Sequence, residues 1–458
     1  MNRNCHHCDE FSRASLLRRG AAQARAGLPA IEPGMPLPAG TGLDRRSFVS
    51  GVFGLALSIY GFGKLGLFEE GIAQAAAAPA KPVLVSVFLP GGADSLSVLY
   101  PALDTRYHML RPKLALPDGA GPVFSEDTRL HWHPSLRPLA ALHAEGKVSV
   151  FPAIGYTHPD QSHFTSRHFW EVGATEARLS SGWLGRYLDR AGTNDNPLQG
   201  LSLDYQLQPA LASTKVPVAS LAAPDEYTFW APGVWREVED RMLETFRPLG
   251  ARRSDPGLNH AARAAAQSDR LRRQLAPFAA SSGSGFGSPV AYPDVDSAFP
   301  RQLSGLAAML AANLPLRCVA ITAPGEYDTH ADQPQALADG LDATARTLFA
   351  FQRDLEARGL ADRVLTLVWS EFGRRGEENG SDGTDHGAAG AAFLIGKRAR
   401  GTMVGEFPGL SNLDENGNLR PTSDFRSVYC SLLEQWLGTD AAAVIPHAKS
   451  FGRPVLVK

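Results

Sequence analysis

Cysteine and an excess of charge of one sign are what this sequence lacks. Four cysteines in 458 residues are too few for a small disulfide-stabilised scaffold. Lys and Arg number 45 and Asp and Glu number 47, so the net charge is −2 and no basic surface for nucleic acid is expected. We therefore predict no nucleic-acid partner. What the sequence does have is a hydrophobic content of 44%, which is enough for a large core and argues against a disordered chain.

Residues 1–78 are interpreted as a leader that carries an export signal. Arg45 and Arg46 precede an apolar stretch at 49–68, and small residues follow at 73–78. This order is typical of secretory signals, and the paired arginines resemble those of the twin-arginine pathway. A lysine and several glycines make the stretch a poor permanent membrane helix. We predict a signal read by the twin-arginine export machinery and a periplasmic or extracellular protein; an uncleaved signal would leave a membrane anchor.

The rest of the chain, residues 79–458, is interpreted as one α/β domain. Its middle part is charge-rich and helical in pattern, and we interpret residues 195–298 as a helical cap or insertion on that domain. Cys318 and Cys430 are its two cysteines. Outside the cytoplasm they could form one disulfide, whereas burial in apolar segments would leave two free thiols. The sequence leaves this choice, and the oligomeric state, open.

Strands and helices are predicted to alternate along this domain. Continuous apolar and β-branched runs indicate buried strands at 82–89, 147–152, 317–322, 364–369 and 391–395. Apolar residues at helical spacing indicate helices, the longest at 333–358 and a late one at 427–437. The alternation predicts a mostly parallel, doubly wound sheet with helices on both faces.

Metal-type ligands follow several predicted strands, at the edge where open α/β sheets bind ligands. They are Asp94 after 82–89, Asp328 and His330 after 317–322, Glu371 after 364–369, and Asp385 with His386 in a glycine-rich loop. Each has an ordinary alternative, such as a turn aspartate, a surface histidine or an ion pair between Glu371 and Arg374. Mixed carboxylate and imidazole donors favour Zn, Mn or Fe over Mg or Ca. We predict one or two divalent ions, with zinc favoured.

Ser162 opens a predicted helix, and two roles are open for it. Serine before a helix is commonly an N-cap. A serine at a helix N-terminus is also well placed as a nucleophile, because the backbone N–H groups there favour the anions of acyl or phosphoryl transfer. The spacing of residues around Ser162 does not decide between these roles.

The ordered motifs resemble the bacterial family known as domain of unknown function 1501, which is similar to the alkaline phosphatase and sulfatase superfamily. Seven segments carry the resemblance in the family order: VFLPGGADSL at 87–96, LHWHPSL at 130–136, QSHFTSRHFWEVG at 161–173, GWLGRYL at 182–188, YDTHADQ at 327–333, SEFGRR at 370–375 and NGSDGTDHG at 379–387. The resemblance implies a three-layer αβα fold of alkaline-phosphatase type with metals at the strand ends.

The same resemblance assigns roles to individual residues. Asp94 matches a metal-ligating aspartate, Ser162 takes the place of the nucleophile, and His386 matches a late histidine ligand. The superfamily's D-x-x-x-H motif is shortened here to Asp328-Thr329-His330. Where the superfamily has an Asp-His pair, this chain has Glu371-Phe372. The missing imidazole suggests that a second metal position is altered or lost.

Two classes of function follow. The first is an exported metal-dependent hydrolase of phosphate or sulfate esters, acting on a small anionic substrate. Ser162 would attack, and His163 or Arg374 would stabilise the transferring group. The second is a catalytically degenerate exported binding protein of the same fold. A serine esterase is disfavoured because no G-x-S-x-G elbow surrounds Ser162.

Overall fold

The structure is a computed structural model, and it describes residues 59–60, 81–226, 241, 245, 256–279 and 285–458. The predicted export signal lies outside this set, apart from Ile59–Tyr60, which forms a short strand, β1. Among the described residues, no helix is both long and apolar enough to span a bilayer.

A nine-stranded sheet forms the centre of the fold, in the order β1-β7-β6-β8-β2-β9-β12-β5-β13. Its further strands are β2 (Val83–Phe88), β5 (Val148–Gly155), β6 (Gly200–Ser202), β7 (Val218–Ser220), β8 (Cys318–Thr322), β9 (Val364–Trp369), β12 (Gly390–Ile395) and β13 (Ser423–Asp424). The pairings from β7 to β9 and between β5 and β13 are parallel, whereas β12 is antiparallel to both of its neighbours. The predicted mixed α/β fold with a mostly parallel sheet is confirmed.

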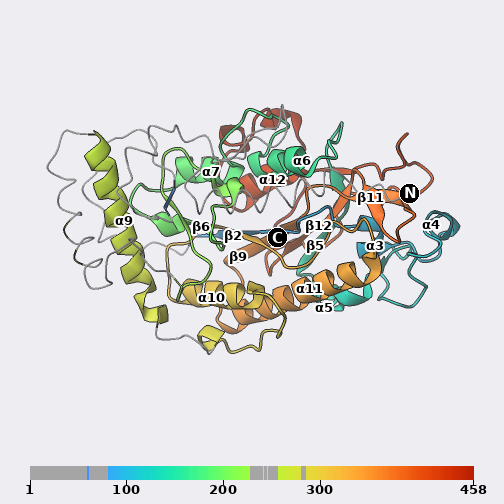
Figure 1. Cartoon of the computed structure of the whole chain (residues 1–458), viewed down its shortest axis with the longest axis horizontal. Coiled ribbons are helices and arrows are strands. Elements are labelled where there is room, and N and C mark those ends of the chain that lie inside the picture. Colours follow the sequence, from blue (N-terminus) through green and yellow to red (C-terminus); the bar gives the residue numbers. More distant parts are fainter. Residues whose placement is uncertain (1–58, 61–80, 227–240, 242–244, 246–255, 280–284) are drawn as a thin grey trace.

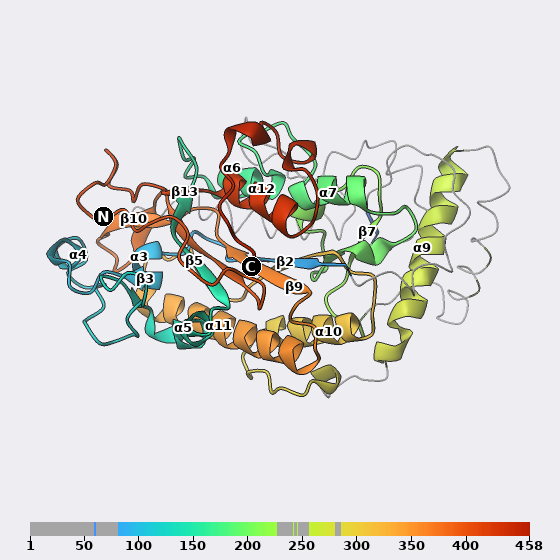
Figure 2. The same cartoon turned by 180° about the vertical axis from the view of Figure 1, so that it is seen from behind.

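Helices cover both faces of the sheet, which gives three layers (Figure 1). One layer contains α5 (Arg137–Ala144), α10 (Phe299–Ala311) and α11 (Gln333–Ala357). The other contains α6 (His163–Val172), α7 (Trp183–Ala191) and α12 (Phe425–Gln435). Figure 2 shows the same two layers from behind.

The central strand β2 packs against a helical layer on each face of the sheet. All six of its residues are buried. Val85 and Val87 pack into the core on one side, and Leu84 and Phe88 pack into the core on the other, because successive side chains of a strand point to opposite faces. A continuous apolar run therefore serves as a strand between two helical layers.

The register of the central strands determines where the site lies. Phe88 of β2 is opposite Thr322 of β8 and Trp369 of β9, both in parallel pairs. The segments that follow these three strands therefore leave the sheet at one edge. The predicted ligands Asp94, Asp328 and Glu371 lie on those segments.

Residues 200–202 and 218–220 of the predicted insertion are strands of the central sheet, whereas α9 (Pro256–Ala279) is a long helix at one end of the molecule (Figures 1 and 2). The division of the chain into a leader and a domain with an insertion stays a prediction. Both cysteines of the domain, Cys318 and Cys430, are buried free thiols.

Short elements surround the strand ends. They are α3 (Ser95–Val98), β3 (Leu99–Tyr100), α4 (Thr105–Leu110), β4 (His131–Trp132), β10 (Arg374–Glu378) and β11 (Thr384–His386). The strands β10 and β11 form an antiparallel hairpin in which Arg374 lies opposite His386.

Candidate metal centre

Three side chains that the sequence holds far apart converge beyond the strand ends. His163 is the first residue of α6, Asp328 follows β8, and His386 ends β11. One ligand atom from each lies within 4.8 Å of the other two. The Nε2 atom of His163 is 3.3 Å from Asp328 Oδ2, and the Nε2 atom of His386 is 3.4 Å from Asp328 Oδ1. We call these three residues the His-Asp-His cluster.

The ligand atoms of the cluster lie close enough together for one metal ion to contact all three residues. Ligands bound at about 2.0–2.1 Å to a tetrahedral ion lie roughly 3.3–3.4 Å apart. His163 Nε2 and His386 Nε2 lie 3.3 and 3.4 Å from different oxygens of Asp328, and one ligand atom from each of the three residues lies within 4.8 Å of the other two. Two imidazole nitrogens and one carboxylate oxygen form a donor set that suits zinc and leaves a position open. The residues present therefore fit a divalent metal ion.

Each imidazole of the cluster is oriented through its other nitrogen. His163 Nδ1 lies 2.8 Å from Oε1 of Glu371, and His386 Nδ1 lies 2.8 Å from the backbone oxygen of Gln161. An Nδ1–H group that donates to such an acceptor leaves Nε2 available as a ligand, the arrangement that metal-binding histidines adopt. For neutral His386, this places the Nε2 lone pair towards an Asp328 carboxylate oxygen. A cation between these two acceptors would satisfy both.

The charges of the cluster are strongly coupled. Burial disfavours a charge on Asp328, but the nearby imidazoles of His163, His330 and His386 and the Arg374 guanidinium hold the pKa of Asp328 well below its usual range. Burial likewise opposes a charge on His163, yet Asp328 and Glu371 raise its pKa to about 9. In His386 burial prevails and lowers the pKa to about 4. A metal ion would therefore displace a proton from His163 when it binds.

Glu371, a predicted ligand, is the partner of His163 on the side of the ring away from Asp328. It is fully buried, and its Oε1 and Oε2 atoms accept the backbone N–H groups of Gly91 at 2.9 Å and Gly92 at 3.1 Å. Although burial opposes its charge, His163 and these N–H groups keep the pKa of Glu371 below its usual range. Successive N–H groups of this kind form an anion-binding nest. The structure thus places Glu371 behind the cluster, as the residue that orients an imidazole.

Two glycines make this nest possible. Gly91 has φ +117° and Gly92 has φ +74°, a region that favours glycine. A Cβ atom on Gly91 would lie 2.4 Å from the backbone nitrogen of Asp328, and one on Gly92 would lie 2.3 Å from the Phe372 ring. The close approach of the loop after β2 to the other strand ends therefore requires both glycines.

His330 and Asp385 form a second imidazole–carboxylate pair beside the cluster. His330 Nε2 is 3.2 Å from Asp328 Oδ1 but makes no hydrogen bond, and its Nδ1 atom is 3.3 Å from Asp385 Oδ1. Burial opposes a charge on His330, while Asp328 and Asp385 raise its pKa to about 9. His330 therefore lies beside the His-Asp-His cluster, and its predicted role as a ligand stays a prediction.

Asp94 is the predicted ligand that the structure keeps apart from the cluster. It is completely buried, caps α3, and forms an ion pair with Arg111. It also accepts hydrogen bonds from Ser97 at 2.6 Å and from Gln333 at 2.7 Å. Burial opposes its charge, but Arg111 lowers the pKa of Asp94. This arrangement favours a structural role, in which Asp94 anchors the loop after β2.

Arg374 pairs with Asp328, and its predicted role in stabilising the transferring group stays a prediction. Its side chain is fully buried and donates to Asp328 Oδ1 at 2.6 Å, rather than pairing with Glu371. Its other hydrogen bonds go to backbone oxygens of the surrounding loops, namely those of Gly91, Gly92, Tyr327 and Thr384. Because its three nitrogens are occupied, this geometry favours a positioning role over contact with a substrate.

Ser162 lies directly next to the cluster. It takes the N-cap position of α6, between Gln161, whose carbonyl contacts His386, and His163. Its hydroxyl makes no capping hydrogen bond. The ordinary capping interaction is therefore not formed, and the role of Ser162 as a nucleophile stays a prediction.

Several contributors could not be found in the sequence. The carbonyl of Gln161 and the N–H groups of Gly91 and Gly92 act through the backbone, so no side-chain motif signals them. His163 was assigned to charge stabilisation, and its ligand geometry emerges only when α6 meets the loop after β8. The one available signal was that His163 lies within a helix N-terminus beside Ser162.

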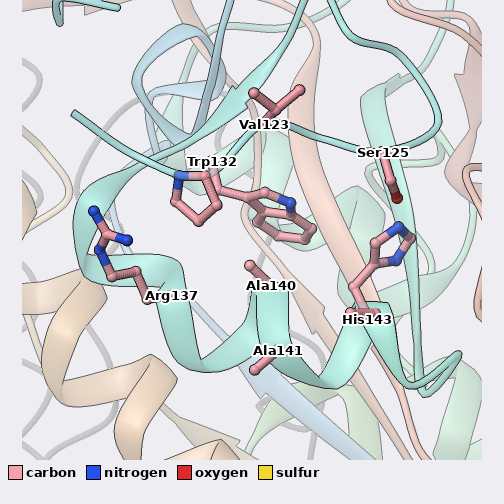
Figure 3. A pocket seen from close by; sticks show the side chains of 9 residues that line it. Val123, Ser125, Trp132, Arg137, Ala140, Ala141 and His143 are labelled. Carbon is pink, nitrogen blue, oxygen red and sulfur yellow. The ribbon is translucent and has the colours of Figure 1, made fainter. Parts of the chain in front are cut away.

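A separate pocket of about 360 Å³ lies against α5, away from these residues (Figure 3). Val123, Ser125, Trp132 and His143 are among the residues that line it (Figure 3). None of the residues that line it is a predicted site residue or a member of the His-Asp-His cluster.

Three solved structures show similarity to the chain. A protein in the alkaline phosphatase superfamily from Vibrio parahaemolyticus is 11% identical, with a TM-score of 0.33 over 81% of this chain and 69% of that one. The lipoteichoic acid synthase LtaP from Listeria monocytogenes is 9% identical, with a TM-score of 0.32 over 80% and 74%. The C-terminal periplasmic domain of EcEptC from Escherichia coli, in complex with Zn, is 9% identical, with a TM-score of 0.34 over 80% and 87%. Scores at this level do not establish a shared function.

The sequence itself matches a protein family more directly. No curated protein matches the chain. The family described as "Protein of unknown function (DUF1501)" matches residues 159–432, which is more than half of the chain and includes the whole His-Asp-His cluster. The chain belongs to this family.

Proposed function

We propose that this protein is an exported, metal-dependent hydrolase of phosphate or sulfate esters, with zinc as the favoured metal. The observation that carries the proposal is the His-Asp-His cluster, whose ligand atoms lie within 4.8 Å of one another. The imidazoles of His163 and His386 are each oriented by an acceptor on Nδ1, which is how proteins prepare histidines for a metal.

Each residue of the cluster and its surroundings would have its own role in such a reaction. Asp328, His163 and His386 would hold the ion, with His330 as a fourth donor. A bound divalent ion supplies Lewis-acid charge beside the ester oxygens. Ser162 provides the hydroxyl, whose oxygen bonds to phosphorus or sulfur as the alcohol leaves with the proton. Water then releases phosphate or sulfate and restores the serine.

Export is part of the proposal and rests on the leader. The paired arginines at 45 and 46 and the apolar stretch after them support recognition by the twin-arginine export machinery. The protein would then act in the periplasm or outside the cell, or remain anchored if the signal is not removed. Its substrate would be a small anionic ester, and the near-neutral charge argues against nucleic acid.

Metal content and turnover test this proposal together. The purified protein without its leader is dialysed against zinc, and its metal content and hydrolysis of 4-nitrophenyl phosphate and 4-nitrophenyl sulfate are measured. We expect bound zinc and turnover of at least one ester, both lost in His386→Ala and Asp328→Asn. His447→Ala is the matched control, because that histidine is 80% exposed. Equal zinc content in all four proteins would contradict the site.

A degenerate binding protein is the second candidate, and Phe372 favours it. The Phe372 ring centroid lies 4.8 Å from those of both His163 and His386, in the sequence position where a second metal would need an imidazole. One metal without a second could bind an anion without turning it over. In that case Ser162→Ala would leave ligand binding unchanged, and no substrate would give burst kinetics in the parent protein.

A further inference from the structure

A buried amide links the two segments that carry Asp328 and His386. Gln333 is the first residue of α11, and it is only 1% exposed. Its Oε1 atom accepts the hydroxyl of Thr329 at 2.9 Å and the hydroxyl of Thr384 at 2.6 Å. Both threonines are buried, one directly after Asp328 and the other two residues before His386. One amide oxygen therefore joins the loop after β8 to the strand β11.

The direction of this amide is determined by Asp94. The Nε2 atom of Gln333 donates to Asp94 Oδ2 at 2.7 Å. Because Asp94 forms a buried ion pair with Arg111, it is ionised and offers only acceptor oxygens. The amide nitrogen of Gln333 therefore faces Asp94, and the amide oxygen faces the two threonines. A buried amide that has a partner on each side is held in one orientation.

Thr384 lies on the same face of β11 as His386. Side chains two residues apart in a strand point to the same face, and here both residues are buried whereas Asp385 between them is exposed. The backbone N–H of Thr384 also donates to the backbone oxygen of Thr329 at 3.0 Å. The strand that presents His386 is thus tied to the loop that presents Asp328, and the two side chains approach to 3.4 Å.

We propose that Gln333 is a positioning residue of the metal centre, which holds Asp328 and His386 at the separation that one ion requires. This inference rests on the proposed function, because it concerns the same site. Gln333 acts through Thr329 and Thr384, the side chains that its oxygen contacts. Without the amide, two buried hydroxyls would lose their acceptor, and the two segments would be free to move apart.

Gln333→Met tests this role, because methionine is an unbranched side chain of similar length that has no amide. Zinc affinity is measured in the purified protein by competition with a chromophoric chelator. We expect it to fall by about 10-fold or more, as when other residues that support metal ligands are removed. Gln352→Met is the matched control, since Gln352 is buried near the other end of α11, where it donates to Glu356 at 2.8 Å. This control should bind zinc as the parent does.

A double-mutant cycle separates positioning from a general loss of stability. Thr384→Val keeps the branched shape of the side chain and removes the hydroxyl that Gln333 accepts. If Gln333 acts through this hydroxyl, Thr384→Val lowers zinc affinity in the parent but causes no further loss in Gln333→Met. Equal losses in both backgrounds would overturn the assignment. So would a parent-like zinc affinity of a folded Gln333→Met protein.

Amide hydrogen exchange in the metal-free protein tests the positioning role without zinc. In Gln333→Met we expect exchange within 327–333 and 379–387 to be at least about 10-fold faster than in the parent, since the contact between these segments loosens. In Gln352→Met, exchange within the same segments should be unchanged. Parent-like exchange in Gln333→Met would contradict the role of Gln333. If the parent binds no zinc but exchange rises in this way, the proposed hydrolase fails and the role of Gln333 in holding the two segments stands.

Discussion

His163 Nε2 lies 3.3 Å from Asp328 Oδ2, although one residue begins a helix on one face of the sheet and the other follows the strand β8. The contact exists because both segments leave the sheet at the same edge. The contact places an imidazole beside a carboxylate that is distant in the sequence, so no motif of neighbouring residues predicts it.

Replacing Glu371 tests whether it orients His163 or binds the metal. Glu371→Gln keeps an oxygen for the N–H groups of Gly91 and Gly92 but removes the charged acceptor on His163 Nδ1. We expect zinc affinity to fall by about 10- to 100-fold, as for other residues that orient a ligand. Competition with a chromophoric chelator measures it, and the exposed Glu415→Gln is the control. Complete loss of zinc would indicate a direct ligand instead.

Replacing Ser162 separates its two candidate roles. Since the hydroxyl makes no capping hydrogen bond, Ser162→Ala should change the free energy of unfolding by no more than about 0.5 kcal/mol. Loss of a nucleophile should lower turnover by about 10⁴-fold or more. Urea unfolding and steady-state hydrolysis measure the two effects. A loss of about 1 kcal/mol with turnover intact would instead assign Ser162 to capping.

Asp94 should prove structural. Asp94→Ala leaves Arg111 as an unpaired charge where both side chains are fully buried, so we expect the free energy of unfolding to fall by about 3 to 5 kcal/mol. The folded fraction should still bind zinc. The double variant Asp94→Ala with Arg111→Met should be less destabilised than the single one, because no buried charge remains unpaired. Zinc loss in a folded Asp94 variant would restore it as a ligand.

His133 gives the metal-free protein a pH dependence of known sign. Burial lowers the pKa of His133 from 6.5 to about 4. Between these values the unfolded chain binds the proton and the folded protein does not, so stability falls as the pH is lowered from 7 to 4. The free energy of unfolding should decrease by about 3 kcal/mol from this group.

The measurement is a urea unfolding series at several pH values, with His133→Asn as the comparison. Asparagine can still accept the N–H of Ser135, which His133 Nδ1 accepts at 3.1 Å, but it does not titrate. The difference between parent and variant isolates His133 from the other histidines. An equal pH dependence in the two proteins would contradict the assignment.

Much of the fold could be predicted from local patterns. The six residues of β9, Val364–Trp369, and the long helix α11 agree with their predicted ranges to within one residue at each end. Continuous apolar runs and regular helical stripes carry this information, because burial on both faces of a sheet demands them. The short strands β6 and β7 were missed, since three residues are too few to show a period.

The site could be predicted only in part. Asp328 and His386 were predicted as ligands and lie in the cluster, and His163 was predicted for a different role. Glu371 and Asp385 were predicted as ligands as well, but each instead contacts the Nδ1 atom of a histidine. Which oxygen or nitrogen faces the cluster depends on the direction of each side chain. The spacing of residues along the chain does not determine that direction.

By itself, the sequence determined the class of fold and the edge of the sheet at which ligand-type residues gather. Both follow from patterns that neighbouring residues carry, namely apolar runs, helical spacing and glycine turns after strands. Only the tertiary structure decided which of those residues meet. It paired Asp94 with Arg111 and turned Glu371 towards His163. These outcomes depend on how helices and loops from distant parts of the chain pack around one sheet edge.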